Sequence, residues 1–345
     1  MTRRFDIKTV PIGGGAPVTV QSMTNTRTAD FDATLSQVNR LYRAGADIVR
    51  VTLNERGAVE SFRRLCAESP VPIVADIHFD YRLALAAVEA GAAKVRVNPG
   101  NLQGEDHVKA VAEACVAKGI GVRIGVNAGS LPTDATGDTL AEKMVTAALD
   151  EARHFEKYGL KDICLSVKSS NAKTTFDAYT ALHDRADYPL HLGVTEAGAG
   201  ESALAKSYSA IGGLLLSGVG DTIRVSLTAD PVEEVKAGVE LLRAVGLRRD
   251  FVNVISCPTC GRTEFDVVAV AAQVRDLTKD IRKPLTVAVM GCVVNGLGEG
   301  KEADLGIAGG RERSVLFVKG EKVGTVDNAD VLVTLRRYIE EMTNG

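Results

Sequence analysis

The sequence lacks the features of membrane-spanning, secreted and nucleic-acid-binding proteins. No run approaches the roughly 18 consecutive apolar residues that a membrane-spanning helix needs. The segment Met1–Gly15 lacks the apolar core of a secretion signal, so we expect a cytoplasmic protein. The 41 Lys and Arg residues are outnumbered by 44 Asp and Glu, and the net charge is −3. No basic block occurs, which argues against nonspecific nucleic-acid binding as the main task.

Cysteine is also scarce, with six residues in a chain of 345. That number is too small for a disulfide framework in a chain of this length. Three cysteines are scattered and are expected to be core residues, namely Cys66, Cys115 and Cys164. The other three gather in the last quarter, namely Cys257, Cys260 and Cys292. In a reducing compartment such a group is typical of metal ligands or redox thiols.

A repeated unit of helix, glycine and apolar strand is present in the first two-thirds of the chain. Ala44–Val51 reads AGADIVRV and Ala90–Val97 reads AGAAKVRV. The shared glycine suits the left-handed residue that ends a helix, and the β-branched run that follows predicts a buried parallel strand. Looser copies follow at Gly119 and Gly159.

Eight such strands are expected before about Leu247, separated by amphipathic segments. They lie around Val18–Gln21, Ile48–Thr52, Ile73–Ile77, Val95–Asn98, Val122–Val126, Ile163–Val167, His191–Thr195 and Thr222–Ser226. Eight strand–helix units in under 250 residues predict a (β/α)₈ TIM-type barrel over residues 1–247. A doubly wound parallel sheet is the structural alternative.

A smaller α+β domain is predicted over residues 248–345, where the repeat ends. We expect a strand at Val252–Cys257, a helix at Glu264–Asp280 and a strand at Leu285–Met290. A glycine-rich loop then precedes a hairpin at Val315–Val326 and a last helix near Ala329–Met342.

Charged residues occupy the predicted strand ends, where a barrel carries its functional side chains. Five cations come from five different strands, namely Arg50, Arg96, Arg123, Lys168 and Arg224. Any single one could be a buried ion pair or a residue at the rim, but Asp76 and Glu196 are too few to neutralise all five. The planar fork of arginine suits phosphate oxygens, so we expect a small diphosphate or doubly phosphorylated ligand.

The cysteines of the second domain have a spacing that allows several kinds of site. Cys257 and Cys260 form a C-x-x-C pair, and Cys292 follows a strand and opens the glycine-rich segment. Glu299 is the nearest plausible fourth ligand. An iron–sulfur cluster, a structural zinc site, a dithiol–disulfide pair and plain core cysteines are all compatible with this spacing.

Several longer motifs resemble those of the 4-hydroxy-3-methylbut-2-enyl diphosphate synthases of the non-mevalonate isoprenoid pathway. The most specific are SCPTCGRTEFD and VAVMGCVVNGLGE, at Ser256–Asp266 and Val287–Glu299. VQSMTNT at Val20–Thr26, VRVNPGN at Val95–Asn101, VRIGVNAGSL at Val122–Leu131 and GVTEAG at Gly193–Gly198 support them. The resemblance covers essentially the whole chain, in the short two-domain bacterial form. The family usually has proline at the position of Leu297.

The resemblance implies an iron–sulfur oxidoreductase that opens and dehydrates 2-C-methyl-D-erythritol 2,4-cyclodiphosphate. It further implies a 4Fe-4S cluster, flavodoxin or ferredoxin as electron donor, and a head-to-tail homodimer. By motif position the cluster ligands are Cys257, Cys260, Cys292 and Glu299. The diphosphate ligands are Arg50, Arg96, Arg123, Lys168, Arg224 and Ser226. Residues expected around the carbon skeleton are Asp76, His78, Asn98, Asn127 and Glu196, with Glu196 as the candidate proton donor or acceptor.

Two other classes of protein are compatible with parts of the sequence. One is a phosphate-binding barrel lyase or synthase whose second domain holds a structural zinc. The other is a non-catalytic iron–sulfur sensor, which would need a basic nucleic-acid-binding face for which the sequence offers no clear candidate.

Overall fold

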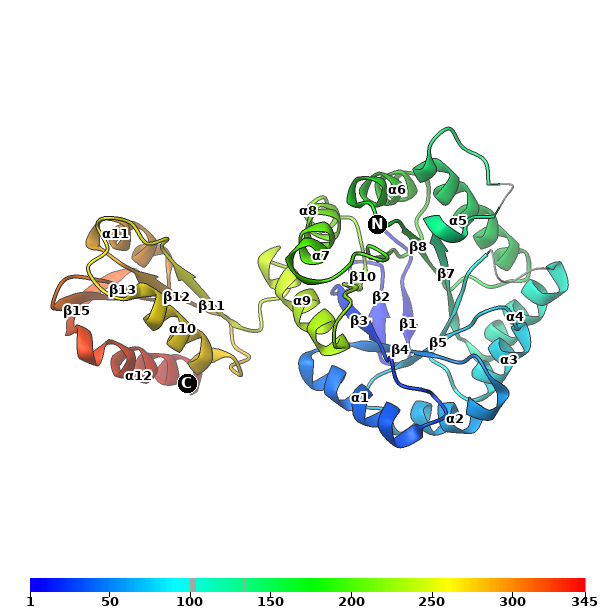
Figure 1. The fold of residues 1–345 in the computed structure, drawn as a ribbon, viewed down its shortest axis with the longest axis horizontal. Helices are drawn as coiled ribbons and strands as arrows, with labels where there is room; N and C mark the ends of the chain where they lie inside the picture. Colours follow the sequence, from blue (N-terminus) through cyan, green and yellow to red (C-terminus); the bar gives the residue numbers. More distant parts are fainter. Residues whose placement is uncertain (100–103, 133–134, 345) are drawn as a thin grey trace. The chain divides into compact units, whose positions relative to one another are not determined.

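A computed structural model describes residues 1–99, 104–132 and 135–344 (Figure 1). The chain divides into two compact units, Met1–Leu247 and Arg248–Gly345. The end of the motif Val95–Asn101 lies outside the described residues. No helix in the described ranges is both long enough and apolar enough to cross a membrane.

The first unit is built around a ring of eight parallel strands. In chain order these are β3 (Thr19–Met23), β4 (Ile48–Thr52), β5 (Ile73–Asp76), β6 (Lys94–Val97), β7 (Gly121–Asn127), β8 (Ile163–Lys168), β9 (His191–Leu192) and β10 (Thr222–Ile223). They pair in the order β8-β7-β6-β5-β4-β3-β10-β9. A parallel bridge from Leu165 to Leu190 links β8 to the segment before β9. The predicted barrel is therefore confirmed, and the doubly wound sheet was the wrong alternative.

Helices surround this ring and cover its outer face (Figure 1). They are α1 (Phe31–Ala44), α2 (Val59–Glu68), α3 (Tyr81–Glu89), α4 (Glu105–Lys118), α5 (Leu140–Lys157), α6 (Ala172–Arg185), α7 (Gly200–Ser207), α8 (Gly213–Leu216) and α9 (Pro231–Ala244). Helix α1 shows how the repeated sequence begins and ends a helix. At its start, the Asp30 side chain accepts a hydrogen bond from the Ala33 N–H. The helix ends at Gly45, whose φ of 108° few other residues adopt.

A short hairpin that the sequence analysis missed closes one end of the barrel. Strands β1 (Phe5–Ile7) and β2 (Val10–Ile12) pair antiparallel. Their apolar side chains pack with buried residues at the beginnings of the barrel strands, among them Ile48, Val74 and Cys164. The amino ends of the strands are thus sealed by apolar contacts, and the carboxyl ends are left for polar chemistry.

The second unit is a five-stranded sheet with helices on both faces. Its elements are β11 (Val252–Ser256), α10 (Val267–Thr278), β12 (Leu285–Met290), α11 (Val293–Glu302), β13 (Leu305–Ala308), β14 (Arg313–Val318), β15 (Glu321–Asp327) and α12 (Val331–Asn344). Val287 and Val289 pack with α10 and α12, whereas Ala288 and Met290 point to the other face. The strands β11, β12 and β13 run parallel, and β14 and β15 are antiparallel additions.

The glycine-rich segment after β12 is helical, so the expectation of a loop there was wrong. Glycines lower helix propensity, which is why the sequence favoured a loop. Tertiary packing overrides this preference, because a Cβ on Gly296 would lie 2.1 Å from the Cβ of Ala308 on β13. Gly296 therefore allows α11 to lie close against the sheet.

Replacing Gly296 by alanine is expected to destabilise the second unit by about 1–3 kcal/mol, the usual cost of overpacking. Gly298 provides the matched control, since a Cβ there meets nothing within 4 Å. Gly298→Ala should be neutral or stabilise the helix by up to about 1 kcal/mol. Denaturant unfolding of the two variants measures the difference, and equal effects would contradict the packing argument.

Candidate active site at the barrel mouth

The five predicted cations all come together inside the barrel. Arg50, Arg96, Arg123 and Lys168 are buried, with exposed fractions of 9%, 5%, 1% and 7%. Arg224 follows β10 directly and is half-buried. Burial lowers the pKa of Lys168 well below its usual range, and the four arginines add to that shift. The cations therefore act on one another electrostatically across a shared interior.

Asp76 at the end of β5 is the carboxylate at the centre of this group. It lies 3.6 Å from Arg50 Nε, 3.2 Å from Arg96 Nη1 and 3.3 Å from His78 Nε2. Burial alone would raise the pKa of the Asp76 carboxyl, but Arg50, His78 and Arg96 outweigh it and hold this pKa well below its usual range. Asp76 is therefore ionised and orients two of the arginines.

A second carboxylate in the site is Glu234, which the sequence analysis missed. Glu234 lies on α9 and is 4% exposed. It accepts hydrogen bonds from Arg224 Nε at 3.2 Å and Nη2 at 3.1 Å, and another from the Leu227 N–H at 3.0 Å. Glu234 lies in the first turn of a helix, where acidic residues are common, so its sequence position gave no sign of a role in the site. Only its contact with Arg224 in the folded chain identifies it.

Glu196, by contrast, does not neutralise the cations as the sequence analysis assumed. Its side chain is exposed, and no described ion pair joins it to any of the five. Its backbone has a φ of 51°, a left-handed conformation that costs energy in a residue other than glycine. Asp76 and Glu234 thus balance two of the five cations, and the remaining positive charge calls for an anionic ligand.

Two glycines, one in β7 and one directly after β9, provide the space that the long cationic side chains need. A Cβ on Gly125 of β7 would lie 2.9 Å from Arg96 Nε. A Cβ on Gly193 would lie 2.8 Å from Lys168 Nζ. Met23 is a further contact that the sequence did not reveal, since Arg50 donates to its sulfur from Nη2 at 2.8 Å.

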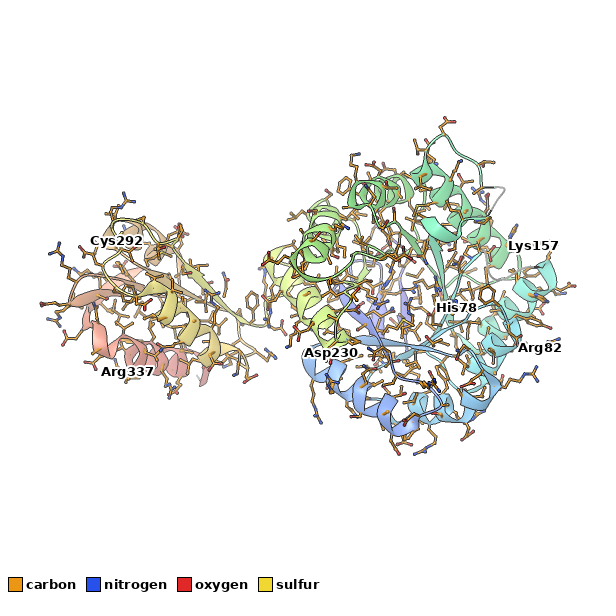
Figure 2. All side chains as sticks on the ribbon, in the orientation of Figure 1. His78, Arg82, Lys157, Asp230, Cys292 and Arg337 are labelled. Carbon is orange, nitrogen blue, oxygen red and sulfur yellow. The ribbon has the colours of Figure 1, made fainter. Side chains whose placement is uncertain are left out.

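The remaining predicted substrate residues also follow barrel strands at their carboxyl ends. Asn98 is 4% exposed and donates to Ser130 Oγ at 2.9 Å. His78, which Figure 2 labels, is half-buried, as are Asn127 and Ser226. Each lies at or just beyond the end of its strand, so the barrel brings these residues to the same rim.

Because of Asp76, the barrel is expected to lose stability at acid pH. Since the pKa of Asp76 is lower in the folded than in the unfolded chain, its contribution is present above about pH 4 and is lost as the pH falls further. Asp76→Asn is therefore expected to destabilise the barrel by about 3 kcal/mol at pH 7. The difference from the wild type should shrink towards pH 3. Denaturant unfolding at both pH values measures it, and a pH-independent difference would refute the assignment.

The cysteines of the second unit lie at the carboxyl ends of neighbouring parallel strands. Cys257 follows β11, and Cys292 follows β12 at the N-cap position of α11. The Gly291 N–H donates to Cys257 Sγ at 3.1 Å, which brings the first cysteine to the turn that holds Cys292 (labelled in Figure 2). Such N–H···S bonds stabilise a thiolate bound to metal.

The other two predicted ligands lie at the surface of the same unit. Cys260 and Glu299 are exposed. Within the described ranges, no three His, Cys, Asp or Glu side chains are gathered as a ready site for one metal ion. The structure thus places Cys257 beside the Cys292 turn but does not bring the full predicted ligand set together.

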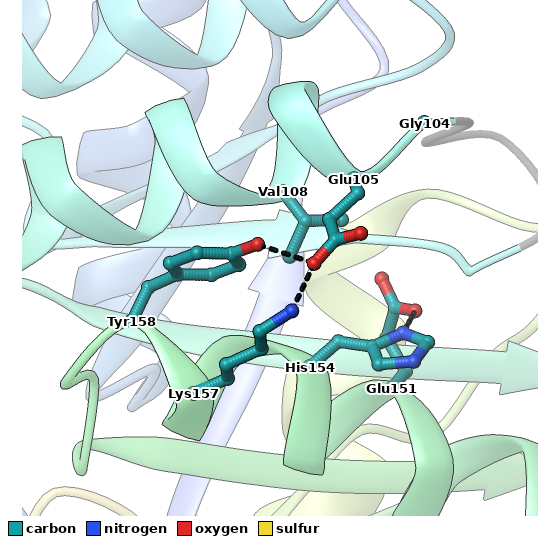
Figure 3. A pocket seen from close by; sticks show the side chains of 7 residues that line it. All are labelled: Gly104, Glu105, Val108, Glu151, His154, Lys157 and Tyr158. Atoms are coloured by element: carbon teal, nitrogen blue, oxygen red, sulfur yellow. Dashed lines mark hydrogen bonds and ion pairs between the residues drawn. The ribbon is translucent and has the colours of Figure 1, made fainter.

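A separate cavity of about 360 Å³ lies outside the barrel ring, between α4 and α5 (Figure 3). Its opposite charges are already paired. Glu105 accepts hydrogen bonds from Tyr158 Oη at 2.7 Å and from Lys157 Nζ, and Glu151 lies 3.5 Å from His154 Nδ1. This cavity therefore lacks the excess positive charge of the barrel mouth.

Comparison with known proteins agrees with this two-part architecture. Residues 2–239 match the GcpE TIM-barrel domain, and residues 253–341 match the GcpE protein C-terminal domain. The chain belongs to the GcpE family. The GcpE barrel match spans every strand that contributes a cation, and the second match spans all three clustered cysteines.

Full-length relatives carry one enzyme name. A protein of Caldanaerobacter subterraneus subsp. tengcongensis is 50% identical over 345 residues, covering 99% of this GcpE chain and 97% of its own. One of Thermotoga petrophila is 48% identical, covering 99% and 98%. Both are named 4-hydroxy-3-methylbut-2-en-1-yl diphosphate synthase (flavodoxin).

Solved structures resemble the barrel fold at much lower sequence identity. The dihydropteroate synthase of Xanthomonas albilineans is 15% identical, with a TM-score of 0.53, over 71% of this chain and 97% of its own. That of Yersinia pestis gives the same TM-score over 71% and 98%. At this identity the likeness concerns only the fold.

Proposed function

We propose that this chain is a 4-hydroxy-3-methylbut-2-en-1-yl diphosphate synthase acting in the non-mevalonate isoprenoid pathway. Its substrate would be 2-C-methyl-D-erythritol 2,4-cyclodiphosphate. The observation that carries the proposal is the group of five cations inside the barrel, of which Asp76 and Glu234 balance only two. The name shared by full-length relatives supports it.

The barrel residues would bind and polarise the diphosphate. Arg50, Arg96, Arg123, Lys168 and Arg224, with Ser226, are proposed to hold its oxygens. Reductive ring opening takes two electrons, breaks a carbon–oxygen bond to the diphosphate and releases a hydroxyl as water. Buried cations stabilise the negative charge that develops on the departing diphosphate oxygen, and they do so strongly because water is excluded.

The carbon skeleton would lie against Asp76, His78, Asn98 and Asn127 at the same rim. Glu196 is proposed to donate or accept the proton that accompanies loss of the hydroxyl. Its exposed carboxyl and strained left-handed backbone, held after β9, support that role, since such strain is concentrated at functional sites.

Cys257, Cys260, Cys292 and Glu299 are proposed to hold a 4Fe-4S cluster. Three thiolates and a carboxylate suit iron, and the Gly291 N–H aimed at Cys257 Sγ fits a cluster sulfur ligand. When bound, the cluster would supply electrons singly from flavodoxin or ferredoxin; the relatives' names specify flavodoxin.

We also propose a head-to-tail homodimer, in which the cysteine unit of one subunit faces the barrel mouth of the other. The polar mouth needs a cover that excludes water, and the electron source must reach it. The proposed thiolate ligands also require reduced cysteines, which fits a location in the cytoplasm. A monomer in solution that turns over at the full rate would contradict the dimer.

Iron, acid-labile sulfide and zinc per chain, measured on protein purified without oxygen, test the cofactor assignment. Four iron and four sulfide per chain are expected. Stoichiometric zinc without sulfide would instead indicate a phosphate-binding barrel lyase or synthase with a structural zinc.

A further inference from the structure

A lysine deeper in the barrel than the five cations is not explained by the site described above. Lys94 opens β6 and lies two residues before Arg96, so both side chains point into the barrel. It is 0% exposed. Its strand neighbours in register are Val74 on β5 and Gly121 on β7. Val74 belongs to the apolar cluster around the β1–β2 hairpin, so Lys94 lies between that plug and the arginines.

Polar groups around Lys94 share its lack of partners. Within the described ranges, Lys94 Nζ has no hydrogen-bond partner, and neither do Arg123 Nε and Nη1 or His191 Nε2. No described ion pair joins Lys94 or Arg123 to a carboxylate. A buried, unpartnered ammonium is costly, because it loses its hydration without compensation.

The charged and titratable groups facing Lys94 come from several strands. They are Arg50 on β4, Arg123 on β7 and Cys164 on β8, together with His191 on β9. Burial, opposed by Cys164 and reinforced by Arg123 and Arg50, lowers the pKa of Lys94 to about 8. The amine therefore gains or loses its proton close to neutral pH.

We propose that Lys94 is a further positioning residue of the barrel site, and that its buried amine takes up a proton when the cyclic diphosphate enters. This inference rests on the proposed function. The proton comes from solvent, and no bond in the substrate changes. Arg96 and Arg123 contact the ligand, whereas Lys94 lies behind them, nearer the amino ends of the strands. Its positive charge partly offsets the negative charge that the ligand brings to these arginines.

Proton uptake on binding is the measurement that tests this role. Titration calorimetry with 2-C-methyl-D-erythritol 2,4-cyclodiphosphate at pH 8.5, in two buffers of different ionisation enthalpy, counts the protons taken up. The wild type should take up about half a proton more per site than Lys94→Met. At pH 7 the variant should bind about tenfold more weakly, since one nearby charge is lost. Methionine keeps a similar volume.

Lys109→Met is the matched control, because Lys109 is an exposed residue on α4 that pairs only weakly, at 4.0 Å, with Glu113. It should match the wild type in uptake and affinity. Lys168 and His191 are buried near the same arginines, and any protons that they take up are counted equally in both titrations. The wild type alone gives an independent check, since its affinity should weaken as the pH rises from 7 to 9.

Equal proton uptake in Lys94→Met and the wild type would overturn the role of Lys94. So would a wild-type affinity that is flat between pH 7 and 9, even if the variant does not fold. Failure of the wild type to bind the cyclic diphosphate at any pH would instead overturn the proposed function.

Discussion

Replacing Arg123 by methionine is expected to stabilise the ligand-free protein while nearly abolishing catalysis. Arg123 is 1% exposed, and two of its guanidinium nitrogens have no hydrogen-bond partner in the described structure. Burial and the neighbouring Arg96 lower its pKa to about 10. The buried Arg123 side chain therefore lowers the free energy of unfolding of the ligand-free protein. An anionic ligand bound beside it would offset that loss. Methionine keeps part of its apolar stem without the charge.

The expected gain in the free energy of unfolding is about 1–3 kcal/mol, as found when buried charges are replaced by apolar residues. The value of kcat/KM should fall by roughly 10²–10³, because a donor to the developing diphosphate charge is lost. Arg82→Met is the control, since Arg82 is exposed on α3 and should change neither quantity much. A less stable Arg123→Met variant with normal turnover would contradict the account of the site.

Replacing Cys292 by serine is expected to remove the cluster and all reductive turnover without unfolding either unit. Cys292 is 7% exposed and occupies the N-cap of α11. Serine is a favoured N-cap residue and has nearly the same shape, so the helix should persist. A hydroxyl is a poor substitute for a thiolate as a ligand of iron.

Iron and sulfide analysis with circular dichroism measures both parts of this expectation. Iron per chain should fall to near zero while the helical signal is kept. Cys66→Ser is the matched control, because burial in α2 raises the pKa of that thiol to about 12 and keeps it neutral. Unchanged iron in Cys292→Ser, or equal loss in both variants, would refute Cys292 as a ligand.

The barrel could be predicted because its information is local. The AGADIVRV and AGAAKVRV segments encode a helix end and a buried strand within eight residues each, and Gly45 and Gly91 adopt the expected left-handed conformation. Cations at strand ends were likewise identified from strand position alone. Five strands then place them in one interior, which the parallel arrangement requires.

The contacts that complete the site could not be predicted, because they join residues that are far apart in the sequence. Glu234 pairs with Arg224 from α9, and Met23 accepts from Arg50 across neighbouring strands. Local propensity was misleading at α11, where close packing of Gly296 on Ala308 outweighs the glycine content. The β1–β2 hairpin was missed because strands of three residues carry almost no periodic signal.

Anaerobic conversion of the cyclic diphosphate is the most direct test of the central claim. The reconstituted full chain is supplied with 2-C-methyl-D-erythritol 2,4-cyclodiphosphate and reduced flavodoxin, and the products are identified by mass spectrometry. We expect 4-hydroxy-3-methylbut-2-enyl diphosphate, with two electrons consumed per molecule formed. Quantitative recovery of unchanged cyclic diphosphate, from protein that carries a full cluster and reducible iron, would contradict the proposed function.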